Sequence, residues 1–280
     1  MKTLIYSFLI ILSLSITYGQ NSQNDEISGI TGCAMDYMEG ALSGDAERIA
    51  RALHPDFNKV YPFIYPATQK TTLVYATYSG LVEYTRSNGM FVEPNERNIK
   101  VKILDIEKEL ATVLVTSVKF YDYLLMEKVE SEWKILNVLW VPNKIADSNS
   151  GNDIELEEAA IEKTARNYAE GYFTGDANRM TQAIHPEIYK STSNIIEKTG
   201  KKAFRNMGSS LLIEAAAGGR GKIPESEWKI TFEVLDIFNN IASAKIFTSQ
   251  FNDYLHLVKI GGEWKIVNVL WQSGPEYKRN

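Results

Sequence analysis

Histidines and aspartates that could act as acids or bases occur twice along the chain at a constant spacing. His54 and His185 are 131 residues apart, and so are Asp122 and Asp253. A histidine can act as a general base near neutral pH. A carboxylate in an apolar cavity acquires a raised pKa that suits acid–base catalysis. The pairs His54 with Asp122 and His185 with Asp253 are therefore the candidate catalytic residues.

Each candidate also has a purely structural explanation. A histidine in the last turn of a helix can satisfy free carbonyl groups, and an aspartate at a strand end or bulge can pair with a lysine or a backbone amide. The recurring lysines Lys59 and Lys190 could attract an anionic ligand, but a solvated position is the ordinary expectation for lysine. No histidine pair, cysteine cluster, Asp-rich loop or Gly-rich loop has the spacing of a metal or phosphate site, so no metal or cofactor is predicted.

Aromatic residues recur at the same spacing and could bind a ligand. Such rings are most simply explained as core, although they also line apolar ligand pockets. With His185 at the pocket mouth, the candidate ligand-binding residues are Tyr37, Tyr123, Trp133, Tyr168, His185, Tyr254 and Trp264.

The spacing of 131 residues extends along most of the chain and indicates duplication of a whole domain. Residues 37–40 and 168–171 share Tyr-x-Glu-Gly, and residues 137–140 and 268–271 share Asn-Val-Leu-Trp. The period is too long for a solenoid repeat. We expect copy one over residues 26–146, a polar linker over 147–153 and copy two over 154–275.

Each copy is predicted to begin with helices and to end with strands. Apolar residues at helical spacing form one stripe over 30–41 and again over 161–172. Gly-Asp then ends this helix and caps a second one, which His-Pro closes. A third helix is expected at 73–84 and 201–215. Strands are predicted at 99–106, 110–120, 121–129 and 133–141, with counterparts 131 residues later.

This order of motifs resembles the nuclear transport factor 2-like superfamily, especially its SnoaL-like branch and the family labelled putative lumazine-binding. The shared motifs are Tyr-x-Glu-Gly, Gly-Asp, His-Pro, Leu-Asp-Ile, Phe-x-Asp-Tyr-Leu and Trp-Lys-Ile, and the resemblance fails at 60–93 and 191–224. It implies an α+β fold of two tandem cone-shaped domains, each with about three N-terminal helices packed on a curved antiparallel sheet around a pocket. It does not fix an activity, because the same cone hosts enzymes and binding modules.

The last predicted strand of each copy is apolar on both faces. Simple alternation places Trp133, Ile135, Asn137 and Leu139 on one face and Lys134, Leu136, Val138 and Trp140 on the other. The second face should then be covered as well, most simply by the other copy. We therefore expect an intrachain pair of domains with Trp140 and Trp271 in the interface.

The middle segment of copy one is crowded with large rings, namely Tyr61, Phe63, Tyr65, Tyr75 and Tyr78. Rings of this size could fill the cone from within. We therefore expect the larger cavity in copy two, bordered by Tyr168, His185 and Trp264.

The first residues indicate export. Lys2 precedes an apolar run from Leu4 to Ile16, and small or polar residues follow, which is the pattern of a signal peptide over residues 1–19. The run is shorter than the roughly 20 residues of a membrane span. The single cysteine cannot form an intrachain disulfide, and a net charge of −5 without a basic cluster argues against nucleic acid.

These features favour an exported, periplasmic or secreted tandem module that binds a small, partly apolar molecule or a protein partner without catalysis. The alternative is a SnoaL-like enzyme of cyclase or isomerase type that uses the His and Asp pairs. In that enzyme, His185 and Asp253 should converge on one cavity.

Overall fold

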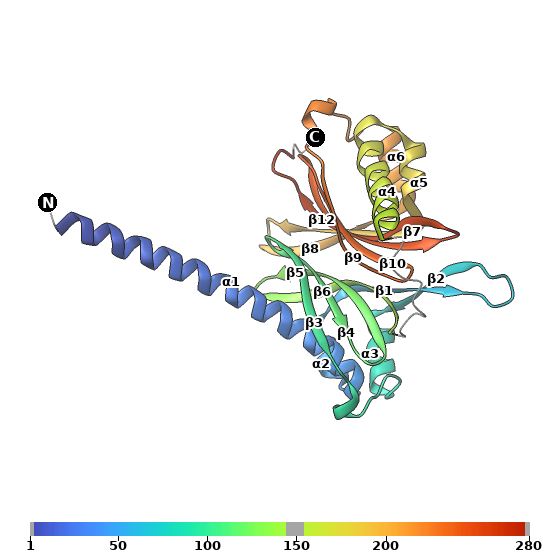
Figure 1. Cartoon of the computed structure of the whole chain (residues 1–280), viewed down its shortest axis with the longest axis horizontal. Coiled ribbons are helices and arrows are strands. Elements are labelled where there is room, and N and C mark those ends of the chain that lie inside the picture. Colours follow the sequence, from blue (N-terminus) through green and yellow to red (C-terminus); the bar gives the residue numbers. More distant parts are fainter. Residues whose placement is uncertain (1–2, 144–153, 278–280) are drawn as a thin grey trace.

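Two domains of the same fold make up the computed structural model, which describes residues 3–143 and 154–277, with side chains from Gln23 onward. Each domain packs helices on one face of a six-stranded sheet, so the predicted α+β class and the tandem duplication are confirmed. The two sheets meet in the middle of the molecule and the helices lie outside (Figure 1). The predicted linker, residues 147–153, lies outside the described residues.

The elements of domain 1 are α1 (Thr3–Ser43), α2 (Ala46–Ala52), β1 (Leu53–Ile64), β2 (Thr71–Thr77), α3 (Tyr78–Arg86), η1 (Pro94–Glu96), β3 (Lys100–Glu107), β4 (Leu110–Thr116), β5 (Phe120–Val129) and β6 (Glu132–Pro142). Those of domain 2 are α4 (Ile154–Thr174), α5 (Ala177–Ala183), β7 (Ile184–Ile196), β8 (Lys201–Met207), α6 (Ser209–Ala217), η2 (Glu225–Glu227), β9 (Thr231–Phe238), β10 (Ile241–Phe247), β11 (Phe251–Ile260) and β12 (Glu263–Ser273). The strand orders are β2-β1-β6-β5-β4-β3 and β8-β7-β12-β11-β10-β9. The β1–β6 and β7–β12 pairs are parallel and all other pairs are antiparallel.

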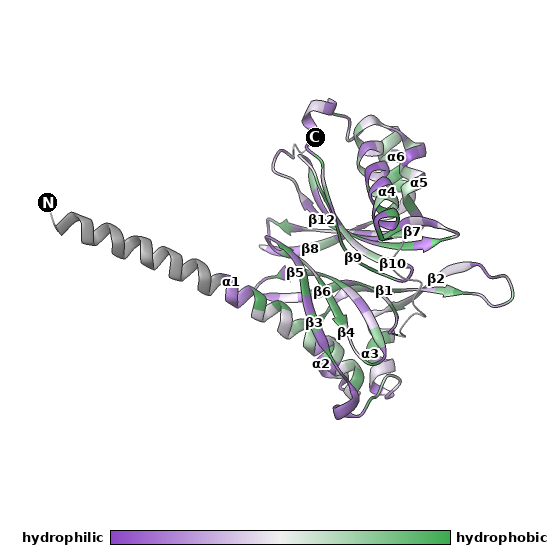
Figure 2. Cartoon of the chain, in the orientation of Figure 1, coloured by the Kyte–Doolittle hydropathy of each residue, from purple (hydrophilic) through white to green (hydrophobic). Residues whose placement is uncertain are grey.

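The first two helices of each domain form as predicted. Ile30, Ala34, Tyr37 and Ala41 are buried, so the apolar stripe of α1 faces the sheet. Figure 2 shows hydrophilic and hydrophobic residues alternating along α4, as expected for a helix with one buried face. The predicted caps are also present, since Asp45 accepts a hydrogen bond from the backbone N–H of Arg48 at 2.9 Å and Asp176 caps α5 in the same way.

Helix α1 is longer than its counterpart α4. The first residue of α4, Ile154, corresponds to Gln23 of α1, so α1 begins 20 residues earlier. This additional segment leads away from domain 1 (Figure 1). Among the described residues, no helix combines the length and apolar character that crossing a membrane would require.

The middle of each copy differs from the prediction. Residues 73–77 belong to strand β2, and the third helix begins only at Tyr78; likewise β8 precedes α6. The reason is that β1 and β7 continue well beyond His-Pro and provide an edge with which β2 and β8 pair, for example Val60 with Tyr75. The 131-residue spacing still holds, since α3 and α6 begin at Tyr78 and Ser209.

A β-bulge in the last strand of each domain reverses the predicted faces. Asn137 pairs with Leu125 and Ile135 pairs with Met126, so Leu136 is an extra residue in β6, and Val267 is its equivalent in β12. An extra residue shifts the alternation of side chains by one. Trp140 and Trp271 therefore pack in the cores of their own domains, and the prediction that they lie between the domains is wrong.

The outer faces of the two sheets cover each other, as expected for an intrachain pair. Leu139 and Val141 of domain 1 pack with Ile241, Val258 and Val267 of domain 2. Hydrogen bonds across the interface come in pairs related by the repeat. Tyr123 Oη donates to Asp236 at 2.6 Å and Tyr254 Oη donates to Asp105 at 2.8 Å. The hydroxyls of Thr112 and Ser243, equivalent residues, lie 3.1 Å apart. The domains are thus arranged like the halves of a symmetric dimer.

Candidate functional site

A lysine, a tyrosine and an aspartate meet inside domain 2. Lys190 Nζ on β7 lies 2.6 Å from Asp253 Oδ2 on β11 and also donates a hydrogen bond to Tyr168 Oη on α4. Tyr168 Oη in turn donates to Asp253 Oδ2 at 2.7 Å. The three residues are at most 6% exposed, so they form a buried ion pair that one hydroxyl bridges.

Domain 1 contains the same cluster. Lys59 Nζ lies 2.9 Å from Asp122 Oδ2 and 2.6 Å from Tyr37 Oη, and Tyr37 Oη donates to Asp122 Oδ2 at 2.6 Å. Each lysine also lies close to aromatic rings. Lys59 Nζ is 4.7 Å from the ring centre of Trp140, and Lys190 Nζ is 5.0 Å from that of Trp271. Aromatic faces attract a cation at this distance, so the bulge that turns both tryptophans inward also helps to hold the ammonium groups.

Burial governs the protonation of the cluster in domain 2. It lowers the pKa of Lys190 and raises the pKa of Asp253, and the attraction between the two ions opposes both shifts. Burial, together with the neighbouring carboxylate, raises the pKa of Tyr168 well above its usual value. Tyr168 is therefore a neutral hydroxyl that donates to the carboxylate, and each ion depends on the other for compensation.

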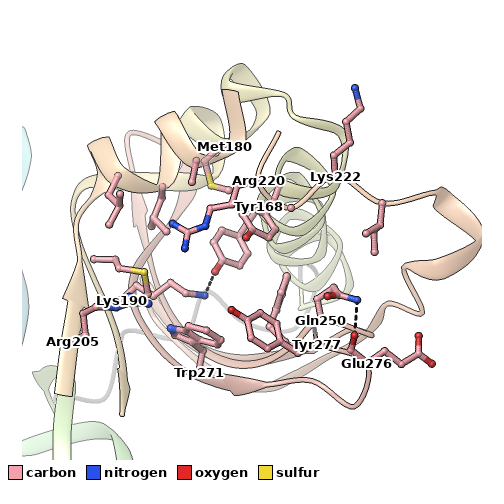
Figure 3. Close-up of a pocket in the computed structure, with 18 of the residues that line it drawn as sticks. Tyr168, Met180, Lys190, Arg205, Arg220, Lys222, Gln250, Trp271, Glu276 and Tyr277 are labelled. Carbon is pink, nitrogen blue, oxygen red and sulfur yellow. Dashed lines mark hydrogen bonds between the residues drawn. The ribbon is translucent and has the colours of Figure 1, made fainter. Parts of the chain in front are cut away.

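A cavity of about 240 Å³ lies over this cluster in domain 2 (Figure 3). Its polar floor is formed by Tyr168 and Lys190. The walls are mostly apolar and aromatic, and charged side chains surround the mouth. The lining residues include Tyr168, Tyr172, Lys190, Arg205, Arg220, Gly221, Lys222, Glu227, Phe251, Trp271, Glu276 and Tyr277.

The corresponding region of domain 1 has different side chains. Gly221 leaves room for the ring of Tyr172, because a Cβ on Gly221 would lie 2.2 Å from that ring. The equivalent residues in domain 1 are Met90 and Ala41, and both are buried in the core.

The crowding expected in copy one involves only some of its rings. Tyr61, which replaces Thr192, stacks on Trp140 with 4.7 Å between ring centres. Tyr65 and Tyr75 are instead exposed, and Tyr75 contacts Glu187 of domain 2. Met90 and Tyr61 are thus larger than the equivalent residues of domain 2, which are Gly221 and Thr192.

The two recurring histidines lie outside the cavity. His54 and His185 stand at the beginning of β1 and β7, and each Nδ1 accepts a hydrogen bond from the backbone N–H two residues later, at 3.1 Å. Burial lowers the pKa of both. The structural explanation placed them in the last turn of a helix, and this is wrong. Each histidine precedes a proline, and a residue before proline leaves the helical region. Neither His185 nor Asp253 lines the cavity, so the predicted convergence is not observed.

Most other predicted ligand residues have structural contacts instead. Tyr123 and Tyr254 form the cross-domain hydrogen bonds described above. Trp133 Nε1 donates to Glu26 at 2.9 Å and Trp264 Nε1 donates to Glu157 at 2.7 Å, which fastens α1 and α4 to their sheets. Tyr168 alone among the predicted residues borders the cavity, and Tyr37 occupies its place in domain 1.

The expectation that Lys59 and Lys190 are solvated is wrong, since both are buried and paired with an aspartate. The sequence contains one signal for this arrangement, because a lysine, a tyrosine and an aspartate all recur at the same spacing. The pairing with a lysine was among the structural explanations for the aspartates. In the described parts of the chain, no three potential metal ligands lie close enough to hold an ion.

Comparison with known proteins agrees with this architecture. Residues 25–141 and 156–272 each match the family described as "Putative lumazine-binding". No curated protein matches the chain.

Solved structures similar to it include three nuclear transport factor 2-like or related proteins. One, of unknown function from Shewanella baltica OS155, is 20% identical with a TM-score of 0.36, and the match covers 45% of this chain and 99% of that one. Another, from Methylobacillus flagellatus KT, is 26% identical with a TM-score of 0.33, covering 43% and 94%. A ketosteroid isomerase-like protein from Erwinia carotovora atroseptica SCRI1043 is 14% identical with a TM-score of 0.30, covering 43% and 98%. Because the two matched regions make up most of the sequence, the chain belongs to the "Putative lumazine-binding" family and carries the matched domain twice.

Proposed function

We propose that domain 2 binds a small, partly aromatic molecule in its cavity without transforming it, and that domain 1 serves as its packed structural partner. One observation carries this proposal. At equivalent positions, domain 2 has Gly221 and Tyr172 around a cavity of about 240 Å³, whereas domain 1 has the buried pair Met90 and Ala41. The family description, which names lumazine as a ligand, also supports binding of a small molecule.

The polar floor favours binding over catalysis. Lys190, Tyr168 and Asp253 form hydrogen bonds with one another, so each of the two ions already has a partner of opposite charge. A general base must come within about 3 Å of the proton that it removes. His185, the most suitable base by residue type, does not line the cavity.

A second candidate function rests on the same floor. Lys190 and Tyr168 both border the cavity, so acid–base chemistry in domain 2 would use these two groups and not the His and Asp pairs. Conversion of a bound compound by the wild type but not by Tyr168→Phe would support this alternative.

Native mass spectrometry of the protein purified from its source tests the proposal of binding. We expect one small molecule to remain bound to the wild type. The variant Gly221→Met introduces the residue found in domain 1 and should lose that molecule, because a Cβ at this position would lie 2.2 Å from the ring of Tyr172 and the added side chain must push atoms into the cavity. Lumazine is the first compound to test by calorimetry with the purified chain.

A matched control lies in domain 1. Met90→Leu changes the equivalent position with little change in volume, which cores tolerate at a cost below about 1.5 kcal/mol. This variant should keep the bound molecule. Retention of the molecule by the filled variant, or a wild type that binds nothing from its source, would contradict the proposal.

We propose further that the chain is exported, to the periplasm or the medium, after removal of residues 1–19. The signal-like composition of these residues supports this. N-terminal sequencing of the protein from its source should find a first residue near Gln20, and an intact Met1 would refute the proposal.

A further inference from the structure

We infer that the ligand of the domain 2 cavity is a flat aromatic anion of about two fused rings, whose charge is bound at the mouth by Arg205 and Arg220. This inference rests on the proposed binding function. It adds the chemical class of the ligand and the residues that select it.

The size and walls of the cavity indicate the aromatic part. An apolar cavity of about 150 Å³ is sufficient for benzene, so the 240 Å³ in domain 2 suits a somewhat larger ring system. Tyr172, Phe251 and Trp271 contribute aromatic rings to the lining. Such rings stack on flat ligands in offset or edge-to-face arrangements.

The charges around the cavity indicate the anionic part. Four cationic side chains line it, against the two carboxylates Glu227 and Glu276. Lys190 is compensated by Asp253, and Glu276 forms an ion pair with Lys229. Within residues 23–143 and 154–277, no carboxylate lies within ion-pair distance of Arg205 or Arg220.

The arginines also have the appropriate position. Arg220 turns its guanidinium group into the cavity, whereas Lys222 extends away from it (Figure 3). Arg205 and Arg220 both border a second hollow of about 790 Å³ that reaches the domain interface at Glu109 and Glu127. The two cations therefore stand where the cavity opens, and a guanidinium group matches a carboxylate with two parallel hydrogen bonds.

Domain 1 provides the internal comparison. Val74 and Gly89 occupy the positions of Arg205 and Arg220. The strand pairing agrees for Val74, which pairs with Tyr61 as Arg205 pairs with the equivalent residue, Thr192. Domain 1, where Met90 replaces Gly221, thus lacks both cations. The open cavity and the two arginines occur together.

Calorimetry with two matched probes tests the inference on the full chain. 2-Naphthoate and 2-naphthamide have the same shape and differ in charge. We expect naphthoate to bind at least about tenfold more tightly, since hydrogen bonds to a charged acceptor are roughly twice as strong as neutral ones. Arg205→Gln/Arg220→Gln should abolish this preference and change naphthamide binding less than about twofold. Lys198→Gln, which removes an exposed cation that does not line the cavity, should leave both affinities unchanged.

Equal affinity for the two probes, or a preference that survives the double variant, would overturn the inference and leave the proposed binding function intact. Failure of both probes to bind would also overturn it. The proposed function is then decided separately by the molecule retained from the source. Both arginines are exposed, so thermal unfolding of the double variant should match the wild type and confirm that altered binding does not reflect loss of the fold.

Discussion

Asp122 and Asp253 each provide the anion for a buried lysine. Replacing Asp253 by Asn should therefore lower the free energy of unfolding by about 3–5 kcal/mol, because Lys190 would keep a buried charge without a partner. Urea denaturation measures this loss. Asp122→Asn in domain 1 should cause a similar loss, since the same contacts surround it.

The double variant Lys190→Met/Asp253→Leu distinguishes the effect of an unpaired charge on stability from the effect of altered packing. Removing both ions together should recover most of the stability that Asp253→Asn loses, because apolar replacements of a buried ion pair are often neutral. If the double variant is as unstable as the single one, the loss comes from packing instead.

His256 is the residue that should make stability depend on acid. It is fully buried at the domain interface, where its Nδ1 lies 3.3 Å from the side-chain amide of Asn268, and burial lowers its pKa to about 3 from 6.5. Below pH 6.5 the unfolded chain binds a proton on this ring, but the folded chain does so only near pH 3. Unfolding is therefore favoured as the pH falls through this window, by about 2–3 kcal/mol at about pH 4.5.

Copy one supplies the variant that tests this effect. Its residue at the equivalent position is Leu125, so His256→Leu should unfold with a weaker dependence on pH between about 7 and 4.5. Chemical denaturation at both pH values measures the difference. An unchanged dependence on pH would show that other groups cause the sensitivity to acid.

Among the elements, the last strand shows what the sequence could predict and what it could not. Its position and its coverage on both faces follow from composition and periodicity, and they are confirmed. The face of the sheet on which Trp140 lies does not follow, because side chains alternate between the two faces and the extra residue Leu136 shifts this alternation by one. Nothing in the sequence identifies Leu136 as a bulge. Whether a strand contains a bulge depends on how it pairs with its neighbour, and the sequence of one strand does not show that pairing.

The cluster of lysine, tyrosine and aspartate could not be predicted for a related reason. Lys59 and Asp122 are both visible as recurring residues, but only the end of a helix was expected at His-Pro, and the strand β1 over the same residues was not predicted. Without that strand, nothing placed Lys59 beside β5 in space. A cavity in copy two that Tyr168 borders agrees with the prediction, whereas the rest of its border does not, because His185 and Trp264 were assigned without knowledge of the strand faces.

Helix α1 should tolerate removal of its first part. The contacts that fasten it to domain 1 include Glu26 with Lys128 and Trp133, and Glu157 makes the same contacts in α4. A chain that begins at Gln20 should therefore unfold at the same urea midpoint as the full chain. Within it, Glu26→Ala should cost about 1–2 kcal/mol, because a half-buried indole N–H and an ammonium lose their acceptor. A lower midpoint after truncation alone would show that the earlier residues stabilise the fold.

For the whole molecule, the packed sheets should make the two domains unfold together. Leu139 is fully buried between them. Leu139→Asp should lower the free energy of unfolding by at least about 3 kcal/mol, since it removes apolar contacts and buries a carboxylate without a partner. Small-angle X-ray scattering should show a larger radius of gyration if the domains separate. Val118→Asp, at a position that is 47% exposed, is the control and should change stability by less than about 0.5 kcal/mol.

The replacement of Gly221 by Met90 has a consequence for stoichiometry. In a dimer of identical chains, any substitution that fills one cavity fills the other as well, so such a dimer binds two ligands or none. A chain that encodes both halves separately is free of this constraint, and one half can give up its cavity for a denser core while the other keeps its own. Titration should accordingly saturate at one bound molecule for each chain, although the two domains are arranged like the halves of a symmetric dimer.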